Sequence, residues 1–247
     1  MTWAGIITSF GLLDYAAIAL LLVAWLGSTY LIEHPPRFRP STSTLMAGYR
    51  RAWMHEFVTR QPRIFDSQIV ANLRQGTAFF ASASMIAIGG GFALLGNTER
   101  LQNVAEDLAL PSDPVIVWEI KLLLLLLFAT NAFLKFVWSH RLFGYCSVIM
   151  AAVPNDETSP IALPRAEKAG EINVTAARGY NRGLRSVYFG ISSAAWLVGA
   201  VPLAIAVLFT LAVVLRREFY SQSRAVLLAD TDDPPPPGRG GGRSLSV

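Results

Sequence analysis

The chain has 247 residues, of which 53% are hydrophobic and only 15% are charged. A water-facing domain carries about 25% charged residues, so the composition excludes an ordinary soluble or disordered protein. The formal charge of +4 could indicate nucleic acid. The basic residues flank apolar stretches, however, where anionic lipid headgroups account for them. We therefore expect membrane lipids as partners, and no nucleic acid.

Four apolar stretches are long enough to cross a membrane, namely residues 11–31, 69–95, 115–138 and 187–215. A helix needs about 20 apolar residues to cross a bilayer. No Lys or Arg precedes Arg37, so the first stretch lacks the basic start of a signal peptide and is expected to be retained. We predict an all-α membrane protein, with a domain of four transmembrane helices over residues 1–229 and a disordered Pro/Gly-rich tail over residues 230–247.

Loop charges predict the orientation, because Lys and Arg are retained on the cytoplasmic side. Residues 33–74 hold seven arginines against three acidic residues, whereas residues 97–114 hold Arg100 against four acidic residues. Residues 140–185 are again basic. This predicts a plasma (inner) membrane protein with both termini outside. Three arginines after the last stretch conflict with that orientation. An odd number of spans would remove the conflict, but residues 142–153 are too short to cross, so we keep four spans.

Residues 41–58 have the pattern of an amphipathic helix on the first cytoplasmic connection. At 100° per residue, one face holds Leu45, Met46, Tyr49, Ala52, Trp53 and Phe57. A helix lying in the headgroup plane would show this pattern. A helix packed against its own bundle would show it as well, so both alternatives stay open.

An internal repeat is suggested by sliding the second stretch onto the fourth. A shift of 109 positions pairs Asn72 with Asn181 and Gly90 with Gly199. Two hairpins related by an axis along the membrane normal would produce such pairs. Small and aromatic residues are common in any membrane helix, so chance similarity explains the pairs equally well.

The second stretch is also rich in small residues. Ala83, Ala87 and Gly91 follow one another at intervals of four, a spacing typical of close helix contact in lipid. We expect this helix at the centre of the bundle. In the fourth stretch, Pro202 removes the hydrogen bond to the Val198 carbonyl, which predicts a kink or an exposed acceptor there.

Arginine and amide side chains gather where the spans are predicted to reach the cytoplasm. This predicted inner belt comprises Asn72, Arg74, Gln75, Asn131, Lys135, Asn181, Arg182 and Arg185. Arginine binds phosphate in a forked geometry, and amides supply neutral donors. Topology requires basic residues but not amides, so the belt predicts a site for an anionic lipid headgroup or another anion. The alternative is that these residues only set the orientation.

Two charged residues near the predicted outer face are expected to pair with each other. Asp14 begins the first span, and Lys121 lies early in the third. A structural ion pair accounts for both, and an ion-binding site is the alternative. No catalytic motif is present, and no histidine has a partner at metal-ligand spacing. We expect no metal, no cofactor and no enzymatic activity.

Several strings of residues resemble a known family. They are Asn72-Leu73-Arg74, Phe79-Phe80-Ala81-Ser82, Ile88-Gly89-Gly90, Tyr180-Asn181-Arg182-Gly183-Leu184-Arg185 and Arg216-Arg217-Glu218-Phe219. Across residues 11–224 the chain resembles a bacterial and plant family of integral membrane proteins, domain-of-unknown-function family 599. The resemblance implies a membrane protein but supplies no reaction, substrate or cofactor.

The function best supported by these patterns is that of a non-enzymatic membrane component. Small-residue helices and the inner belt would bind partner helices or anionic lipid, in a homo-oligomer or a larger membrane complex. The alternative is a small transporter or channel between the two hairpins. Its pathway would be lined by Ser82, Ser84, Asn131, Lys135 and Ser193.

Overall fold

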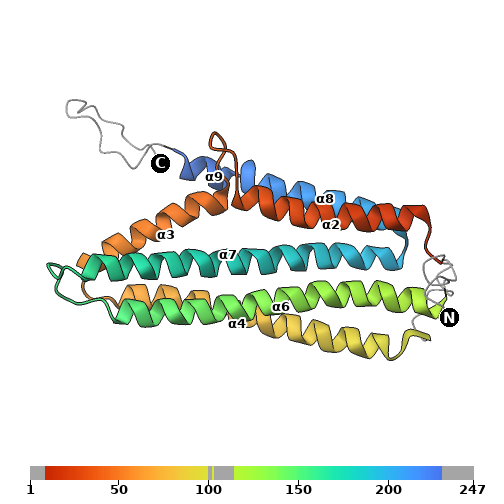
Figure 1. Cartoon of the computed structure of the whole chain (residues 1–247), viewed down its shortest axis with the longest axis horizontal. Coiled ribbons are helices and arrows are strands. Elements are labelled where there is room, and N and C mark those ends of the chain that lie inside the picture. Colours follow the sequence, from red (N-terminus) through yellow and green to blue (C-terminus); the bar gives the residue numbers. More distant parts are fainter. Residues whose placement is uncertain (1–8, 100–101, 103–113, 230–247) are drawn as a thin grey trace, which may run out of the picture.

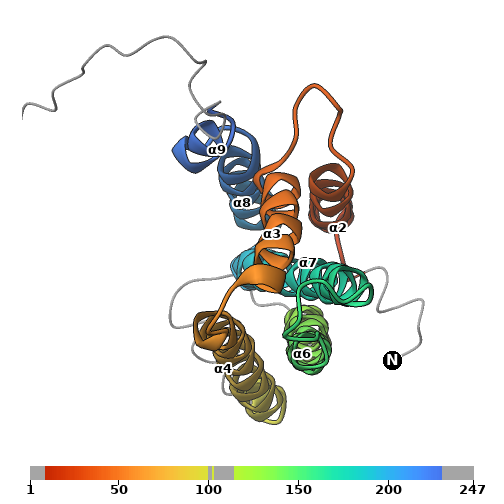
Figure 2. The same ribbon diagram turned by 90° about the vertical axis from the view of Figure 1, so that its left-hand side faces the viewer.

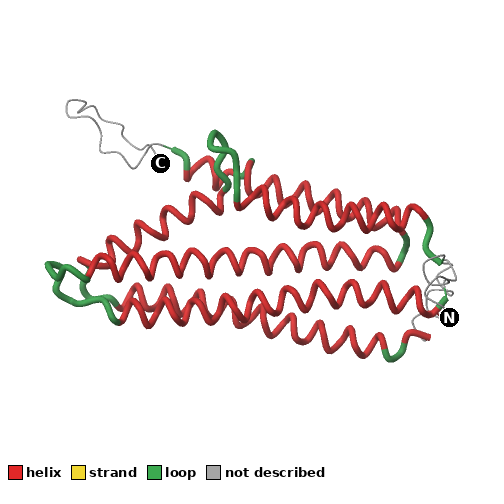
Figure 3. The backbone as a smooth tube through the Cα atoms, viewed as in Figure 1, coloured by secondary structure: helices red, strands yellow, loops and turns green. Residues whose placement is uncertain are grey.

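The computed structural model describes residues 9–99, 102 and 114–229, and this part of the chain is built from helices and their connections (Figures 1 and 3). In chain order the elements are α2 (Leu12–Glu33), α3 (Thr42–Thr59), α4 (Ile64–Leu95), α6 (Val115–Ala151), α7 (Ala162–Ala194), the 3₁₀ turn η1 (Ala195–Leu197), α8 (Ala200–Phe219) and α9 (Gln222–Leu227). The tail predicted for residues 230–247 lies outside the described residues.

Four helical segments in the described part are long and apolar enough to cross a membrane. They are α2, α4, α6 and the segment Ala200–Leu227, which starts with α8. The prediction of an all-α membrane protein with four such spans is therefore confirmed. The first three agree with the predicted stretches, although α4 and α6 each continue well beyond the apolar part.

The fourth predicted stretch, residues 187–215, is divided between two helices. Gly199 separates η1 from α8 and has a φ of 150°, a conformation that favours glycine. Pro202 lies in the first turn of α8, where a missing N–H costs no helical hydrogen bond. The chain reverses here, since the Ser192 and Thr210 hydroxyls meet at 2.7 Å. The predicted kink within one continuous helix is therefore wrong.

Helices α2 and α8 run parallel, with α7 antiparallel to both. Leu21 of α2 clusters with Leu203 early in α8, and Ile32 clusters with Val214 near the end of α8. α2, α4, α6, α7 and α8 thus alternate in direction, although α2 and α8 extend along only part of α6 and α7 (Figure 1). The first and last described residues lie toward opposite ends of the bundle (Figure 1), whereas the predicted orientation places both termini on one side of the membrane; that orientation stays a prediction.

The central helix of the bundle is α7, and the predicted central position of residues 69–95 is wrong. Figure 2 shows α2 and α8 on one side of α7, with α6 and α4 on the other. Gly183 and Gly190 of α7 lie directly against Phe136 and Phe128 of α6, which lets these two helices pack closely. α4 packs along α6, and only 17% of the residues in its most apolar 18-residue segment are buried.

The helices of the two hairpins in the suggested repeat are packed differently. α6 and α7 pack directly against each other, whereas α2 and α4 lie on opposite sides of that pair (Figure 2). The sequence pairs at an interval of 109 residues therefore do not correspond to two equally packed hairpins.

The amphipathic segment forms α3, which packs against α7. Ser41 caps it, accepting a hydrogen bond from the Thr44 nitrogen at 3.2 Å. Met54 and Phe57 are buried in a cluster with residues of α6 and α7. Met46 and Tyr49, two members of the predicted apolar face, are exposed. α3 is therefore packed against its own bundle, through a face that only partly coincides with the predicted one.

Candidate functional site

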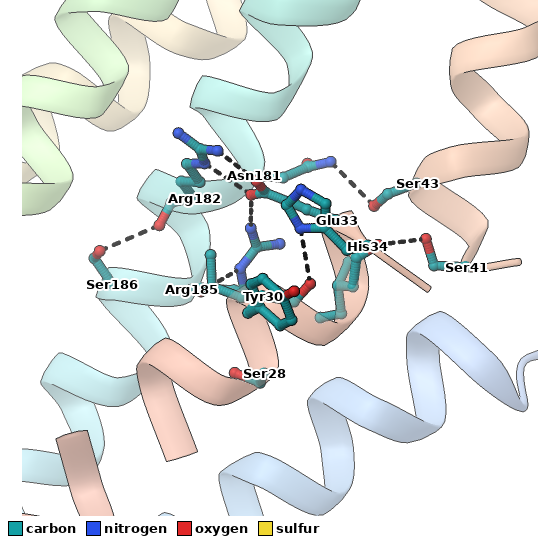
Figure 4. A network of polar contacts seen from close by, with 12 residues as sticks. Ser28, Tyr30, Glu33, His34, Ser41, Ser43, Asn181, Arg182, Arg185 and Ser186 are labelled. Carbon is teal, nitrogen blue, oxygen red and sulfur yellow. Dashed lines mark hydrogen bonds and ion pairs between the residues drawn. The ribbon is translucent and has the colours of Figure 1, made fainter. Parts of the chain in front are cut away.

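A network of charged side chains is centred on Glu33, the last residue of α2 (Figure 4). Arg182 donates from Nε to Glu33 Oε1 at 2.7 Å and also contacts Oε2. Arg185 donates from Nη2 to Oε1 at 2.8 Å and from Nε to the Thr29 hydroxyl at 3.0 Å. Both arginines reach one carboxylate because residues three apart share a face of α7.

This network neutralises part of the predicted inner belt. The Glu33 side chain is 10% exposed and that of Arg185 is 5% exposed. Charges buried to this extent are stable only when they are paired and hydrogen-bonded. Arg182 and Arg185 therefore hold α7 to the end of α2, and a role in anion binding would have to compete with Glu33.

The amides of the belt are also engaged on α7. The Asn181 side chain donates to the Ser43 hydroxyl at 3.3 Å, which joins α7 to α3. The Ser186 hydroxyl donates to the side-chain oxygen of Asn131 at 3.0 Å, which joins α7 to α6. The structure therefore brings Asn131, Asn181, Arg182 and Arg185 together along one length of α7.

The other belt residues lie elsewhere. Asn72, Arg74 and Gln75 are exposed on α4, which lies on the other side of α6 and α7 from α2 (Figure 2). Lys135 is half-buried on α6. The predicted belt is thus two separate groups of side chains rather than one ring.

Sequence reasoning missed the acidic partners of this region. The Glu218 carboxylate, at the end of α8, accepts hydrogen bonds from the Ser43 backbone nitrogen at 3.0 Å and from its hydroxyl at 2.9 Å. A carboxylate at a helix N-terminus is stabilised by the free N–H groups there. The signal in the sequence was the Ser41-Thr42-Ser43 run, which is typical of a helix start.

At the opposite end of α2, Asp14 and Lys121 meet around Trp196. The indole nitrogen of Trp196 donates to Asp14 Oδ1 at 2.7 Å, and the Lys121 ammonium lies 5.9 Å from the centre of the same ring. Both charged residues line a pocket of about 490 Å³. The structure thus places them in one site, while the direct ion pair between them stays a prediction.

An apolar groove runs between α4, α6 and α7, with a volume of about 340 Å³. Ala83 and Ala87 of α4 form one wall, and Gly190, Ile191 and Ala194 of α7 form the other. Both alanines are exposed. The small-residue face predicted for α4 is therefore real, but the bundle itself leaves much of it uncovered.

A comparison with protein families gives a match to the family described as "Protein of unknown function, DUF599", over residues 16–223. The chain belongs to this family. The match confirms the resemblance found in the sequence and extends from α2 into α9. No curated protein and no solved structure matches the chain.

The DUF599 description names no reaction, so any chemistry must come from the side chains. In the part of the chain that is described, no three His, Cys, Asp or Glu residues are grouped so that they could hold a metal ion. His140 lies with Nδ1 at 3.2 Å from the Arg74 carbonyl and 3.3 Å from the Thr77 hydroxyl. These contacts join α6 to α4 and give the histidine a structural role in this DUF599 chain.

Proposed function

We propose that this DUF599 protein is a non-enzymatic membrane component that binds a further transmembrane helix in the groove beside α4. The helix would belong to a second copy or to another subunit of a membrane complex. The observation that carries the proposal is that α4 packs along α6 while its Ala83 and Ala87 face stays uncovered next to Gly190 of α7.

The composition of the groove supports a helix as the occupant. In lipid, helices associate through close packing, so small residues that admit a partner backbone mark a contact face. The groove has small side chains on both walls and is almost entirely apolar. Such walls suit the side chains of a helix better than they suit a polar solute.

Transport between the hairpins is the second candidate, and the geometry supports it less. The hydroxyls of Ser84 and Ser193 bond to the Phe80 and Gly190 carbonyls of their own helices, at 2.8 and 2.6 Å. Hydroxyls engaged in this way are typical of packed helices. Flux into proteoliposomes that is lost in Lys135→Ala would favour transport.

For the location we propose the plasma membrane, or the inner membrane of a bacterium, with the Glu33 end of the bundle in the cytoplasm. Arg216, Arg217 and Arg224 lie at this end, beside the start of α3. They therefore join the basic connections and follow the positive-inside rule. With α7 as a fifth crossing, the conflict that an even number of spans creates would be removed.

Native mass spectrometry tests the partner directly. The protein is purified from its own membrane in a mild detergent, as wild type and as the double variant Ala83→Leu/Ala87→Leu, which fills the groove. We expect a homo-oligomer or a co-purifying subunit with the wild type and its loss in the variant. Ala93→Leu is the control, because Ala93 is exposed on α4 but does not line the groove. A monomeric wild type, or an assembly unaffected by the double variant, would contradict the proposal.

A further inference from the structure

The ends of α2 and α8 and the start of α3 meet at one level of the bundle. α2 ends at Glu33, α8 ends at Phe219, and the hydroxyl of Thr42 at the start of α3 donates to the Glu218 carbonyl at 3.0 Å. Headgroups lie where apolar spans end. This junction is therefore at headgroup depth in a membrane.

Two adjoining pockets open at the junction. A polar pocket of about 270 Å³ lies between α3 and α7, and its walls include Ser43, Arg50, Arg178 and Asn181. A second pocket of about 210 Å³ lies between the ends of α2, α7 and α8. It has an apolar wall of Ile32, Leu184 and Val214, and Arg185 and Arg217 line it as well. Asn181 and Glu218 line both pockets, so the space beside Arg50 continues to this apolar wall.

Arg50 brings a positive charge into the polar pocket without a carboxylate partner of its own. Its guanidinium donates to the side-chain oxygen of Asn173, and in the described part of the chain it forms no ion pair within 4.0 Å. Burial lowers the pKa of Arg50. A partly buried cation held by a neutral amide is costly, so an anion in the pocket would stabilise it.

Arg178 adds a second guanidinium to the same pocket. It is exposed on α7, three residues before Asn181, and it too forms no ion pair within 4.0 Å among the described residues. One carboxylate, Glu218, lines the pocket, and Ser43 already holds it. Two arginines against one engaged carboxylate leave a net positive pocket, which matches the charge and forked geometry of a phosphate group.

We propose that the double pocket binds one anionic phospholipid, with its phosphate between Arg50 and Arg178 and the start of an acyl chain against Leu184 and Val214. The two pockets adjoin through Asn181 and Glu218, as a headgroup site and an acyl-chain site of one molecule must. The phosphate site uses Asn181 of the predicted inner belt, but its arginines are different from Arg182 and Arg185, which Glu33 engages.

The test measures lipid bound to the purified full-length protein by native mass spectrometry, after addition of equal amounts of phosphatidylglycerol and phosphatidylcholine. We expect the wild type to retain phosphatidylglycerol in preference. Arg178→Gln should lower its occupancy about fivefold, since one arginine near anionic lipid contributes about that factor. Arg178 is exposed, so this variant keeps the fold, and Arg50→Gln should act in the same direction. Arg74→Gln is the matched control, an exposed arginine on α4 outside both pockets.

Three results would overturn the site. The first is that both Arg50→Gln and Arg178→Gln bind phosphatidylglycerol as well as the wild type does. The second is that Arg74→Gln loses as much bound phosphatidylglycerol as they do, because general surface charge would then be sufficient to explain lipid binding. The third is displacement of the lipid by inorganic phosphate, because the polar pocket alone would then account for binding. Leu184→Trp should weaken lipid binding by filling the apolar pocket. Ala87→Leu should leave it unchanged, so failure of this site is distinguishable from failure of the α4 groove.

Discussion

Trp196 donates its indole hydrogen to the Asp14 carboxylate at 2.7 Å and thereby joins η1, the turn that follows α7, to the start of α2. At the end of α2, Glu33 accepts a hydrogen bond from Arg185 of α7 at 2.8 Å. Polar contacts therefore hold both ends of α2 against the second half of α7 and the turn that follows it. The polar first half of α7 extends beyond the end of α2 (Figure 1).

The chain direction predicts that the two ends of the described part lie on opposite sides of the membrane. We expect a cysteine at Ser9 to react with a membrane-impermeant thiol reagent from outside, and a cysteine at Ala229 to react only after the membrane is opened. Cys146 is buried and should stay silent. Reaction of both introduced cysteines from outside would contradict a fifth crossing by α7.

Removal of the Glu33 charge should destabilise the bundle. In Glu33→Gln, Arg185 stays almost buried without a carboxylate, and loss of one partner from a buried pair costs about 3 kcal/mol. The measurement is the free energy of unfolding in detergent. Arg182→Gln is the comparison, because its side chain is 44% exposed and an exposed pair contributes at most about 1 kcal/mol. An equal loss of unfolding free energy in the two variants would show that burial of Arg185 does not depend on its pairing with Glu33.

Gly183 should tolerate no side chain. A Cβ at this position would lie 2.6 Å from Cε1 of Phe136, whose ring packs between Phe80 and Tyr180. Overpacking of this kind costs about 1 to 3 kcal/mol, so Gly183→Ala should lower the melting temperature. Gly144→Ala on α6 meets no atom within 4 Å and should raise stability by up to about 1 kcal/mol. A harmless Gly183→Ala would mean that α6 and α7 pack less closely than described.

The contact between α3 and α7 should weaken in acid. Arg51 donates to Glu171 at 2.5 Å, and this hydrogen bond holds the pKa of Glu171 below its ordinary value. Because the folded-state pKa is lowered, the stabilisation is present at neutral pH and is lost as the pH falls below about 4. Both side chains are about half exposed, so the effect is at most about 1 kcal/mol. Glu171→Gln should be less stable than wild type at pH 7 and equal to it in acid. A difference that persists in acid would rule out the ion pair as its cause.

Hydropathy predicted most of the fold because a span needs only a long apolar run, and α2, α4 and α6 each have one. It missed the passage of α7 for the same reason. Only residues 186–197 of that passage are apolar, after the paired Arg182 and Arg185. Gly199 followed by Pro202 is a signal for the end of one helix and the start of another, but apolar residues continue on both sides of it and give the pattern of one continuous span.

The polar sites were harder to predict, because their partners are far apart in the chain. The basic residues Arg182 and Arg185 could be identified from the sequence, but their carboxylate lies about 150 positions earlier, at Glu33. Arg50 likewise contacts Asn173 of α7, a residue 123 positions later in the chain. Such contacts depend on how α3 and α7 pack against each other. The helical pattern of one segment carries no information about that packing.

The binding of a helix in the α4 groove is tested most directly by site-specific photo-crosslinking in the native membrane. A photoreactive residue replaces Ile191, which is exposed at the groove, or Ile205, which is equally exposed on α8 away from it. We expect a protein adduct, a dimer or a complex with another subunit, from position 191 and not from position 205. Equal protein adducts at the two positions, or none at position 191, would contradict a helix-binding role.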